Sequence, residues 1–260
     1  MPSPLFVKLK RAVGKAIADF SLIREGDRVA VAVSGGKDSY SLLHVLGELR
    51  RRSPVRFELA AFNLDPGIPG YRWDTIRDYL VGRGFTVHTL HENHAAIIRD
   101  HQTPGSSACS FCARLRRGTL YTAIRREGFH TLALGHHLDD FIETLLLNLF
   151  YEGAIKAMSP NFVADCGDIT VIRPLVYVPE SDITRFAAEC GFPLVYGCCP
   201  AAGRESRRKI VKRLIENLSA QNPSIRPNLL KALGRVRPRY LMAPGASGPD
   251  AAPDHPHEES

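Results

Sequence analysis

The run Ser-Gly-Gly-Lys-Asp-Ser, which begins at Ser34, combines residue types that bind phosphate. Glycines let the backbone approach an anion, the N-terminus of a following helix attracts it, and serine hydroxyls and Lys37 add donors. The run is not a Walker A loop, because Val31 stands where that motif needs its first glycine and Asp38 follows the lysine. A tight strand-to-helix turn capped by Ser34 or Asp38 would explain the glycines but not Lys37. The run therefore predicts a phosphate-binding loop of another kind.

A second polar run, Gly-His-His-Leu-Asp-Asp, begins at Gly135 between a predicted strand and a predicted helix. Acidic residues are common at helix starts, where they interact with the helix dipole, and this would account for Asp139 or Asp140 alone. Beside a bound triphosphate, however, a carboxylate is what Mg²⁺ needs, because the ion binds one or two carboxylates together with phosphate oxygens. The two runs together therefore favour a site for a triphosphate and Mg²⁺ over a pair of helix caps.

Two pairs of cysteines could bind a metal or form a disulfide. Cys109 and Cys112 form a Cys-x-x-Cys pair, and Cys198 and Cys199 are adjacent much later in the chain. The spacing leaves three possibilities open: a structural zinc site, which adjacent cysteines suit poorly, a disulfide relay, and an iron–sulfur cluster on the first pair and one cysteine of the second. The other two cysteines have no such neighbours and are expected to be ordinary thiols.

The predicted elements would bring these runs together. Apolar, β-branched runs predict strands at 28–33, 56–63, 85–90 and 131–135, and helical patterns alternate with them at 38–51, 72–83, 112–127 and 139–151. This alternation predicts an α/β fold, a parallel sheet with helices on both faces. Ligands of such sheets bind at the carboxyl ends of the strands, where both polar runs lie.

The remaining segments are more irregular. We predict a strand at 170–173 and helices at 181–190, 204–219 and 223–234. The predicted organisation is an amphipathic helix at 1–25, a nucleotide-binding domain with the Cys-x-x-Cys insertion at 26–200, a basic helical region at 201–240 and a disordered tail at 241–260. The first helix would bury one face, formed by Leu5, Leu9, Val13 and Ile17.

Composition is that of a globular protein with a polyanionic partner. The 260 residues are 44% hydrophobic and 23% charged, and the formal net charge is +7. No apolar run is long enough to cross a bilayer, and the N-terminal stretch lacks the unbroken apolar core of a signal peptide. We therefore expect a cytoplasmic protein with no membrane partner, whose cysteines are thiols or metal ligands.

Four blocks of sequence carry a family resemblance. In chain order they are SGGKDSYSLL, CSFCARLRRGTLY, LALGHHLDDFIETLLLNLFYEG and IRPLVYV. They closely resemble the tRNA 2-thiocytidine synthetases, a branch of the PP-loop ATP pyrophosphatases, over roughly residues 5–235. The resemblance implies a Rossmann-like (HUP-type) nucleotide-binding fold and an enzyme that uses ATP, Mg²⁺ and a [4Fe-4S] cluster on three cysteines. Its implied reaction replaces a carbonyl oxygen with sulfur at cytidine 32, in the anticodon loop of tRNA.

Carried over by position, the resemblance implies a set of site residues. Those for ATP are Ser34, Gly35, Gly36, Lys37, Asp38, Ser39, Asn63, Gly135 and Asp140; those for catalysis are Lys37, Asp38, Asp140 and Arg116; those for the cluster are Cys109, Cys112 and Cys199. Asn63 falls where the family contacts adenosine, and Arg116 would face the ATP phosphates or the tRNA backbone. The family usually has Pro-Cys-x-x-Cys-Gly where this chain has Gly-Cys-Cys-Pro, so Cys198 is the alternative to Cys199.

The implied mechanism has two steps, in which ATP adenylates O2 of the cytosine and sulfide then attacks C2. A sulfur donor such as a cysteine desulfurase would supply the sulfur, and the protein could be a homodimer. Alternatives are another PP-loop enzyme that makes thiouridine or lysidine, and a non-catalytic iron–sulfur protein that binds RNA. Related enzymes that thiolate uridine often add zinc-finger cysteine pairs at their ends, and their absence from this sequence favours the cytidine branch.

The basic region is the predicted tRNA-binding surface. Between residues 204 and 239, only Glu205 and Glu216 are acidic, and the basic residues are Arg204, Arg207, Arg208, Lys209, Lys212, Arg213, Arg226, Lys231, Arg235, Arg237 and Arg239. We expect an apolar stripe of Ile210, Val211, Leu214, Ile215 and Leu218 on one side of its first helix, with the basic side chains opposite. Contacts from such a face would position tRNA without reading its sequence.

Overall fold

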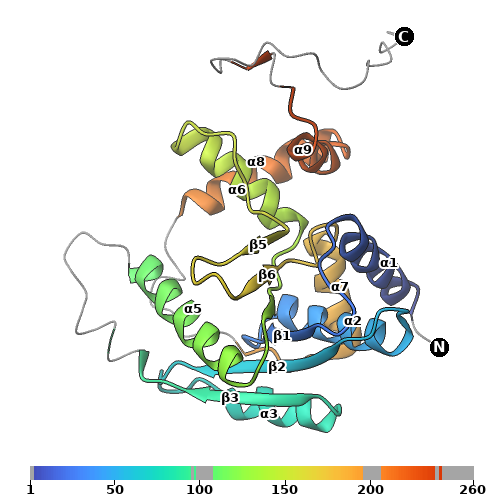
Figure 1. Cartoon of the computed structure of the whole chain (residues 1–260). Helices are drawn as coiled ribbons and strands as arrows, with labels where there is room; N and C mark the ends of the chain where they lie inside the picture. The colour runs from blue at the N-terminus through green and yellow to red at the C-terminus, as the bar shows by residue number, and fades with distance from the viewer. Residues whose placement is uncertain (1–2, 95–96, 98–107, 196–205, 238–239, 242–260) are drawn as a thin grey trace.

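A six-stranded sheet forms the centre of the computed structural model, which describes residues 3–94, 97, 108–195, 206–237 and 240–241. Its strand order is β3-β2-β1-β4-β6-β5 (Figure 1). The strands are β1 (Arg28–Ala32), β2 (Glu58–Asp65), β3 (Thr86–His91), β4 (Thr131–Ala133), β5 (Asn161–Val163) and β6 (Thr170–Ile172). All neighbours are parallel except β5 and β6, so the predicted parallel sheet is confirmed, with a short antiparallel strand added at one edge.

Helices cover both faces of the sheet. They are α1 (Pro4–Asp19), α2 (Lys37–Arg52), α3 (Trp73–Gly82), α5 (Ala108–Arg126), α6 (Leu138–Tyr151), α7 (Glu180–Cys190), α8 (Arg207–Gln221) and α9 (Ile225–Leu233). Alternate residues of β1 divide between two cores: Val29 and Val31 pack with α1, α2, α3 and α7, whereas Ala30 packs on the α5 side. This period of two is what a strand buried on both faces requires.

The amphipathic face predicted for the first helix is present. Leu5, Leu9 and Val13 of α1 are buried against the core, and Ile17 is partly buried beside them. The predicted tail, apart from residue 241, lies outside the described residues. Among the helices of the described residues, none combines the length and the apolar character needed to span a membrane.

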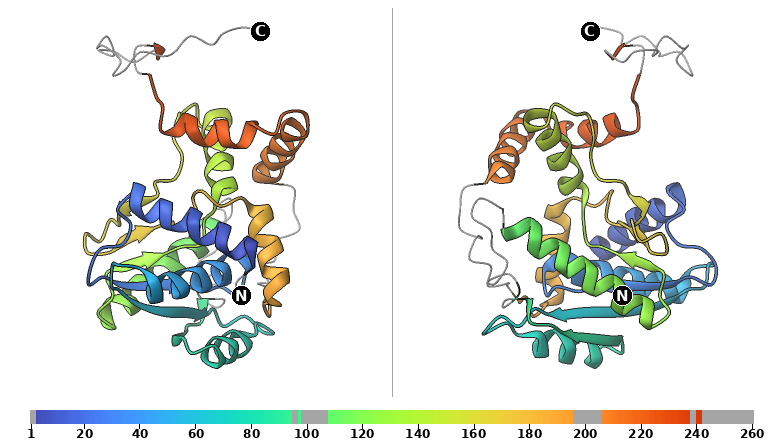
Figure 2. Two further views of the ribbon diagram at one scale, coloured as in Figure 1. Left: turned by 90° about the vertical axis from the view of Figure 1, so that its right-hand side faces the viewer. Right: turned by 60° about the vertical axis from the view of Figure 1, so that its left-hand side comes forward.

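α8 and α9 stand on α6, away from the sheet (Figure 2). Val211 and Ile215 are buried against α6, but Ile210, Leu214 and Leu218 are exposed by 45%, 38% and 39%. The predicted single apolar stripe of this helix is therefore wrong in part. α6 and α9 contact only a narrow side of α8, and the apolar residues cover a wider arc than that side can bury.

The chain reverses its direction of winding between β1 and β4. From β1 it continues to β2 and β3 on one side, and it then returns to place β4 on the other side of β1, in the register Val29↔Thr131. Loops that follow two such strands diverge from each other, and ligands of open α/β sheets bind between them. Both polar runs of the sequence follow these two strands, as predicted.

Candidate nucleotide and catalytic site

The loop after β1 presents backbone groups to a ligand. α2 begins at Lys37, and its N-cap residue is Gly36, for which the described residues provide no side-chain cap. Gly35 has φ of +81°, and a Cβ there would lie 2.8 Å from Cδ1 of Ile76 and 2.9 Å from Cβ of Val195. Glycine is therefore required at this position. The uncapped N–H groups of the first turn suit a phosphate, which helix N-termini bind.

The two serines of this loop differ in role. Oγ of Ser39 donates to the Gly36 carbonyl at 3.0 Å and accepts from the Ser34 amide at 3.3 Å, so this buried hydroxyl shapes the loop. The side chain of Ser34 is exposed, and its carbonyl accepts a hydrogen bond from the Tyr71 hydroxyl at 3.1 Å. Burial raises the pKa of Tyr71, which keeps the hydroxyl a donor. Sequence reasoning missed Tyr71, because no local pattern connects it with a loop so far back in the chain.

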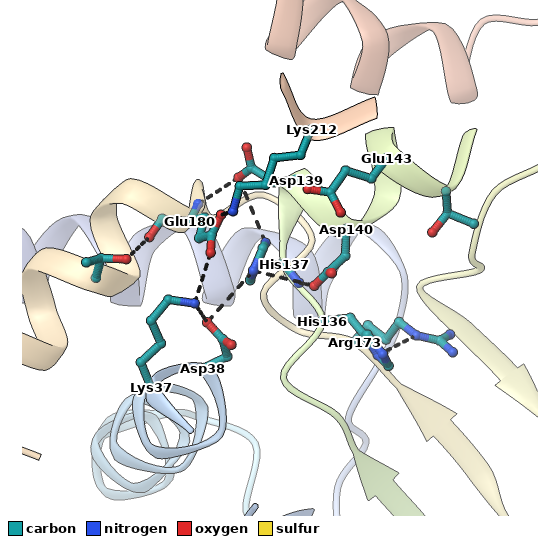
Figure 3. A network of polar contacts seen from close by, with 12 residues as sticks. Lys37, Asp38, His136, His137, Asp139, Asp140, Glu143, Arg173, Glu180 and Lys212 are labelled. Atoms are coloured by element: carbon teal, nitrogen blue, oxygen red, sulfur yellow. Dashed lines mark hydrogen bonds and ion pairs between the residues drawn. The ribbon is translucent and has the colours of Figure 1, made fainter. Parts of the chain in front are cut away.

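The loop after β4 lies against the start of α2. A Cβ on Gly135 would be 3.1 Å from both the carbonyl carbon of Asp38 and the amide nitrogen of Ser39. In Figure 3, Lys37 and Asp38 face the histidine and aspartates at the start of α6. The structure thus brings the two predicted runs together, with backbone packed on backbone.

Lys37 is held between two carboxylates. Its Nζ lies 2.9 Å from Oδ1 of Asp38 and 3.1 Å from Oε1 of Glu180, the first residue of α7. Burial would lower the pKa of Lys37, but the two carboxylates outweigh burial and raise it. Glu180 also accepts from Nζ of Lys212 at 2.6 Å, and these two lysines lower its pKa to about 2 although burial opposes the shift. Glu180 therefore connects the loop after β1 (residues 34–39, the glycine loop) to α8. No sequence motif indicated this role.

The two aspartates of the second run both lie beside the His137 ring, but their other partners differ. Asp139 is buried, accepts from the Glu180 amide at 2.7 Å and pairs with Nε of Arg226 of α9 at 2.9 Å. Asp140 accepts from the His137 amide at 3.1 Å, and its Oδ2 lies 3.5 Å from Nε2 of His137. That same nitrogen is 3.8 Å from Oδ1 of Asp38. Asp139 thus joins α6 to α7 and α9, whereas Asp140 lies on the side of the glycine loop.

α8 directs positive charge towards these acids. Arg208 lies 3.5 Å from Oδ1 of Asp140 and 3.4 Å from Oε2 of Glu143, a residue of α6 that is only 5% exposed. Burial raises the pKa of Glu143 to about 7, although Arg208 counteracts the shift. Arg208 and Lys212 therefore contact the candidate site, and not only the outer surface expected from the sequence.

Two further predicted residues lie at the same edge of the sheet. Asn63, near the end of β2, is fully buried and its Nδ2 donates to the Val33 carbonyl at 2.8 Å, so the side chain joins the ends of β1 and β2. Its Oδ1 is buried with no hydrogen-bond partner among the described residues. Arg116 of α5 is half-buried, and its charge acts on Tyr71, which holds the glycine loop.

The predicted cluster ligands are described only in part. Cys112 is half-buried near the start of α5, and Cys109 belongs to the same helix, but its side chain lies outside the described residues. Cys198 and Cys199 also lie outside them. Within the described part of the chain, no group of three metal-binding side chains is present. Cys166 is exposed and Cys190 is half-buried, and neither forms a disulfide with another of the described residues.

The glycine loop (residues 34–39) and the acidic loop (residues 135–140) meet where the chain reverses its direction of winding in a parallel sheet. This arrangement defines a nucleotide-binding α/β protein, and comparisons with known proteins specify its class. The PP-loop domain family matches residues 5–218. The chain is 56% identical over 238 residues to the tRNA-cytidine(32) 2-sulfurtransferase of Geobacter sulfurreducens, covering 91% of this chain and 93% of the relative. It is 55% identical over 236 residues to the enzyme of the same name from Geobacter metallireducens, covering 90% and 92%.

A solved structure agrees with this class. The U34-tRNA thiolase NcsA from Methanococcus maripaludis, determined with its [4Fe-4S] cluster, superimposes with a TM-score of 0.71 at 25% sequence identity, covering 88% of this chain and 78% of that one. The chain therefore belongs to the PP-loop family and, within it, to the tRNA-cytidine(32) 2-sulfurtransferases. The resemblance and the fold inferred from the sequence blocks are confirmed.

Proposed function

We propose that the protein is an ATP-dependent tRNA-cytidine 2-sulfurtransferase that converts cytidine 32 of the anticodon loop to 2-thiocytidine. The observation that carries this proposal is the meeting of the two predicted runs beside Lys37 and Asp140, in a chain 56% identical to enzymes of that name. The substrates would be tRNA and ATP, with Mg²⁺ and an iron–sulfur cluster as cofactors. We expect the enzyme to act in the cytoplasm.

The first step would be adenylation of the base. O2 of the cytosine attacks the α-phosphorus of ATP, the bond to pyrophosphate breaks, and an O-adenylated base is formed. The uncapped first turn of α2 and Lys37 would stabilise the charge on the phosphates. Asp140 provides the kind of carboxylate that Mg²⁺ binds together with phosphate oxygens, and its position beside α2 fits that role.

The second step would exchange oxygen for sulfur. A sulfide nucleophile forms a bond to C2, the C2–O bond breaks, and AMP leaves with the original oxygen. A [4Fe-4S] cluster on Cys109, Cys112 and Cys199 would supply an iron that holds this sulfur. Of the three proposed ligands, Cys112 has a described side chain, and its thiol is the ligand type that such a cluster needs. Cys112 lies on the same helix as Arg116, and the charge of Arg116 acts on Tyr71, which contacts the glycine loop. A cysteine desulfurase would deliver the sulfur, and a homodimer remains our expectation.

Mass spectrometry of nucleosides from total tRNA tests the proposal. A strain without this gene should lose 2-thiocytidine, the wild-type gene should restore it, and Cys112→Ser or Asp140→Asn should not. The Cys190→Ser variant serves as the matched control, because this half-buried cysteine lies on α7 and should not affect thiolation. Unchanged 2-thiocytidine in the deletion strain would refute the proposal, and loss of lysidine or of a thiouridine would identify one of the alternative reactions.

A further inference from the structure

A buried arginine holds one histidine of the acidic loop by a single ring nitrogen. Arg173 follows β6, and its Nε lies 3.1 Å from Nδ1 of His136, which follows β4 (Figure 3). Because β4 and β6 are parallel neighbours with Ala133 opposite Ile172, both residues reach the same edge of the sheet. This pair belongs to none of the contacts described above.

Arg173 is itself fixed in place. It is 8% exposed, its NH1 donates to the Ser159 carbonyl, and its guanidinium lies 5.1 Å from the ring centroid of Phe162. Its backbone amide donates to the Pro160 carbonyl at 2.8 Å. A guanidinium held on so many sides presents one N–H to His136 in a defined direction.

This contact determines where His136 carries its proton. A guanidinium can only donate hydrogen bonds, so Nδ1 of His136 must be the unprotonated acceptor. Burial and the charge of Arg173 lower the pKa of His136 to about 4, so the ring is neutral at physiological pH. A neutral imidazole without a proton on Nδ1 carries it on Nε2.

The environment of the ring places it at the candidate site. The other charges that act on it are Asp140 of α6, which raises its pKa, and Arg208 of α8 and His137, which lower it. Arg173 contacts the ring through Nδ1, and the hydrogen bonds among the described residues include none to Nε2. His136 is half-buried, so part of the residue remains open to a ligand.

We propose that His136 is a catalytic residue that donates its Nε2–H to an anionic oxygen of the substrate, and that Arg173 is the positioning residue that fixes this tautomer. The inference rests on the proposed function, and it adds a donor to the reacting groups. The oxygen is either a phosphate oxygen of ATP, on which negative charge builds during adenylation, or the former O2 of the base, which gains negative charge as AMP leaves in the second step. A neutral donor can stabilise that oxygen without giving up its proton, which an imidazolium would do more readily.

The first test observes the tautomer directly, in the purified protein without tRNA. In long-range ¹H–¹⁵N correlation spectra of histidine-labelled protein, the ring whose signals disappear in His136→Asn should stay in the Nε2–H form from pH 5 to pH 8. In Arg173→Met this ring should titrate closer to the ordinary histidine pKa. An Nδ1–H tautomer, or a wild-type His136 that becomes protonated between pH 6 and pH 7, would overturn the inference.

The second test separates donation from packing. His136→Asn keeps an acceptor near the position of Nδ1 for Arg173 but has no donor at the position of Nε2, whereas His136→Gln places an amide N–H near Nε2. In assays that supply tRNA, ATP and sulfide, we expect His136→Asn to lower AMP formation by about 10²-fold, with an unchanged melting temperature, and His136→Gln to restore part of the rate. His130→Asn, at the opposite end of β4 and exposed, is the control.

Nucleotide binding identifies the acceptor. If His136→Asn weakens ATP binding as much as it lowers AMP formation, the oxygen belongs to a phosphate; if ATP binding is unchanged, the oxygen is that of the base. AMP formation by His136→Asn within twofold of wild type, with ATP binding also unchanged, would refute the inference. If wild-type protein formed no AMP when supplied with tRNA, ATP and sulfide, the proposed function would fail, and the tautomer and ATP-binding measurements would still decide the role of His136.

Discussion

Replacing Gly135 by alanine would insert a methyl group between the two loops of the candidate site. Its Cβ would lie 3.1 Å from the carbonyl carbon of Asp38 and the amide nitrogen of Ser39. Carbon atoms in good contact are about 3.5–4.0 Å apart, so the loops must separate by roughly half an ångström. Overpacking of this kind costs about 1–3 kcal/mol. The displaced atoms belong to the first turn of α2, where phosphates are proposed to bind.

The cost can appear in folding or in binding. If the loops keep their positions, the strain lowers the free energy of unfolding; if they separate, the altered phosphate site lowers ATP affinity. We expect the two losses to sum to about 1–3 kcal/mol, which as binding alone is about 5- to 150-fold in Kd. Urea unfolding and calorimetry with a non-hydrolysable ATP analogue measure the two parts.

A matched glycine controls for the substitution itself. A Cβ on Gly14, within α1, meets no atom within 4 Å, so Gly14→Ala should leave ATP binding unchanged and stabilise the helix by up to about 1 kcal/mol. Gly135→Ala protein with wild-type stability and wild-type ATP affinity would refute the reasoning that these loops are in tight backbone contact.

Three other substitutions test separate features of the site. The folded-state pKa of Glu143, about 7, exceeds the ordinary 4.5, so its carboxylate destabilises the fold increasingly as pH rises between these values. Relative to wild type, Glu143→Gln should therefore gain about 2–3 kcal/mol in the free energy of unfolding from pH 5 to pH 8, measured by urea unfolding. The same substitution at the exposed Glu216 of α8 is the control. Asp139→Asn should lower the free energy of unfolding by about 1–3 kcal/mol, whereas Asp140→Asn should mainly abolish AMP formation; equal stability losses would contradict their separate roles. Gly35→Ala should lower the free energy of unfolding by about 1–2 kcal/mol because of the left-handed backbone conformation, and steric overlap should lower it further. A variant with wild-type stability and normal ATP binding would contradict the geometry of this loop.

The sequence was sufficient for the parallel strands of the sheet and for the meeting of its two loops, but it did not predict the antiparallel edge strand β5. Strand and helix periodicities are local, and the rule that ligands bind at the carboxyl ends of parallel strands then places both runs together. Residues contributed by distant elements were missed. Tyr71 and Glu180 lie outside the four sequence blocks, and Arg173 lies within IRPLVYV, but nothing local in that block indicates its contact with His136. Only the tertiary fold brings these residues to the site. The orientation of α8 was also missed in part, because its apolar residues fit more than one buried face.

The reversal of winding between β1 and β4 also affects how the protein is made. Val29 pairs with Leu59 on one side and with Thr131 on the other, so the second pairing closes a much longer loop. The extra loop-closure entropy is about 1 kcal/mol. At about 5–20 residues per second, ribosomal synthesis of the intervening chain takes roughly 5–20 s, during which one edge of β1 has no neighbouring strand. The seam that carries the nucleotide loops therefore forms later than the pairing of β1 with β2, and ATP binding can begin only after about half of the 260-residue chain has been synthesised.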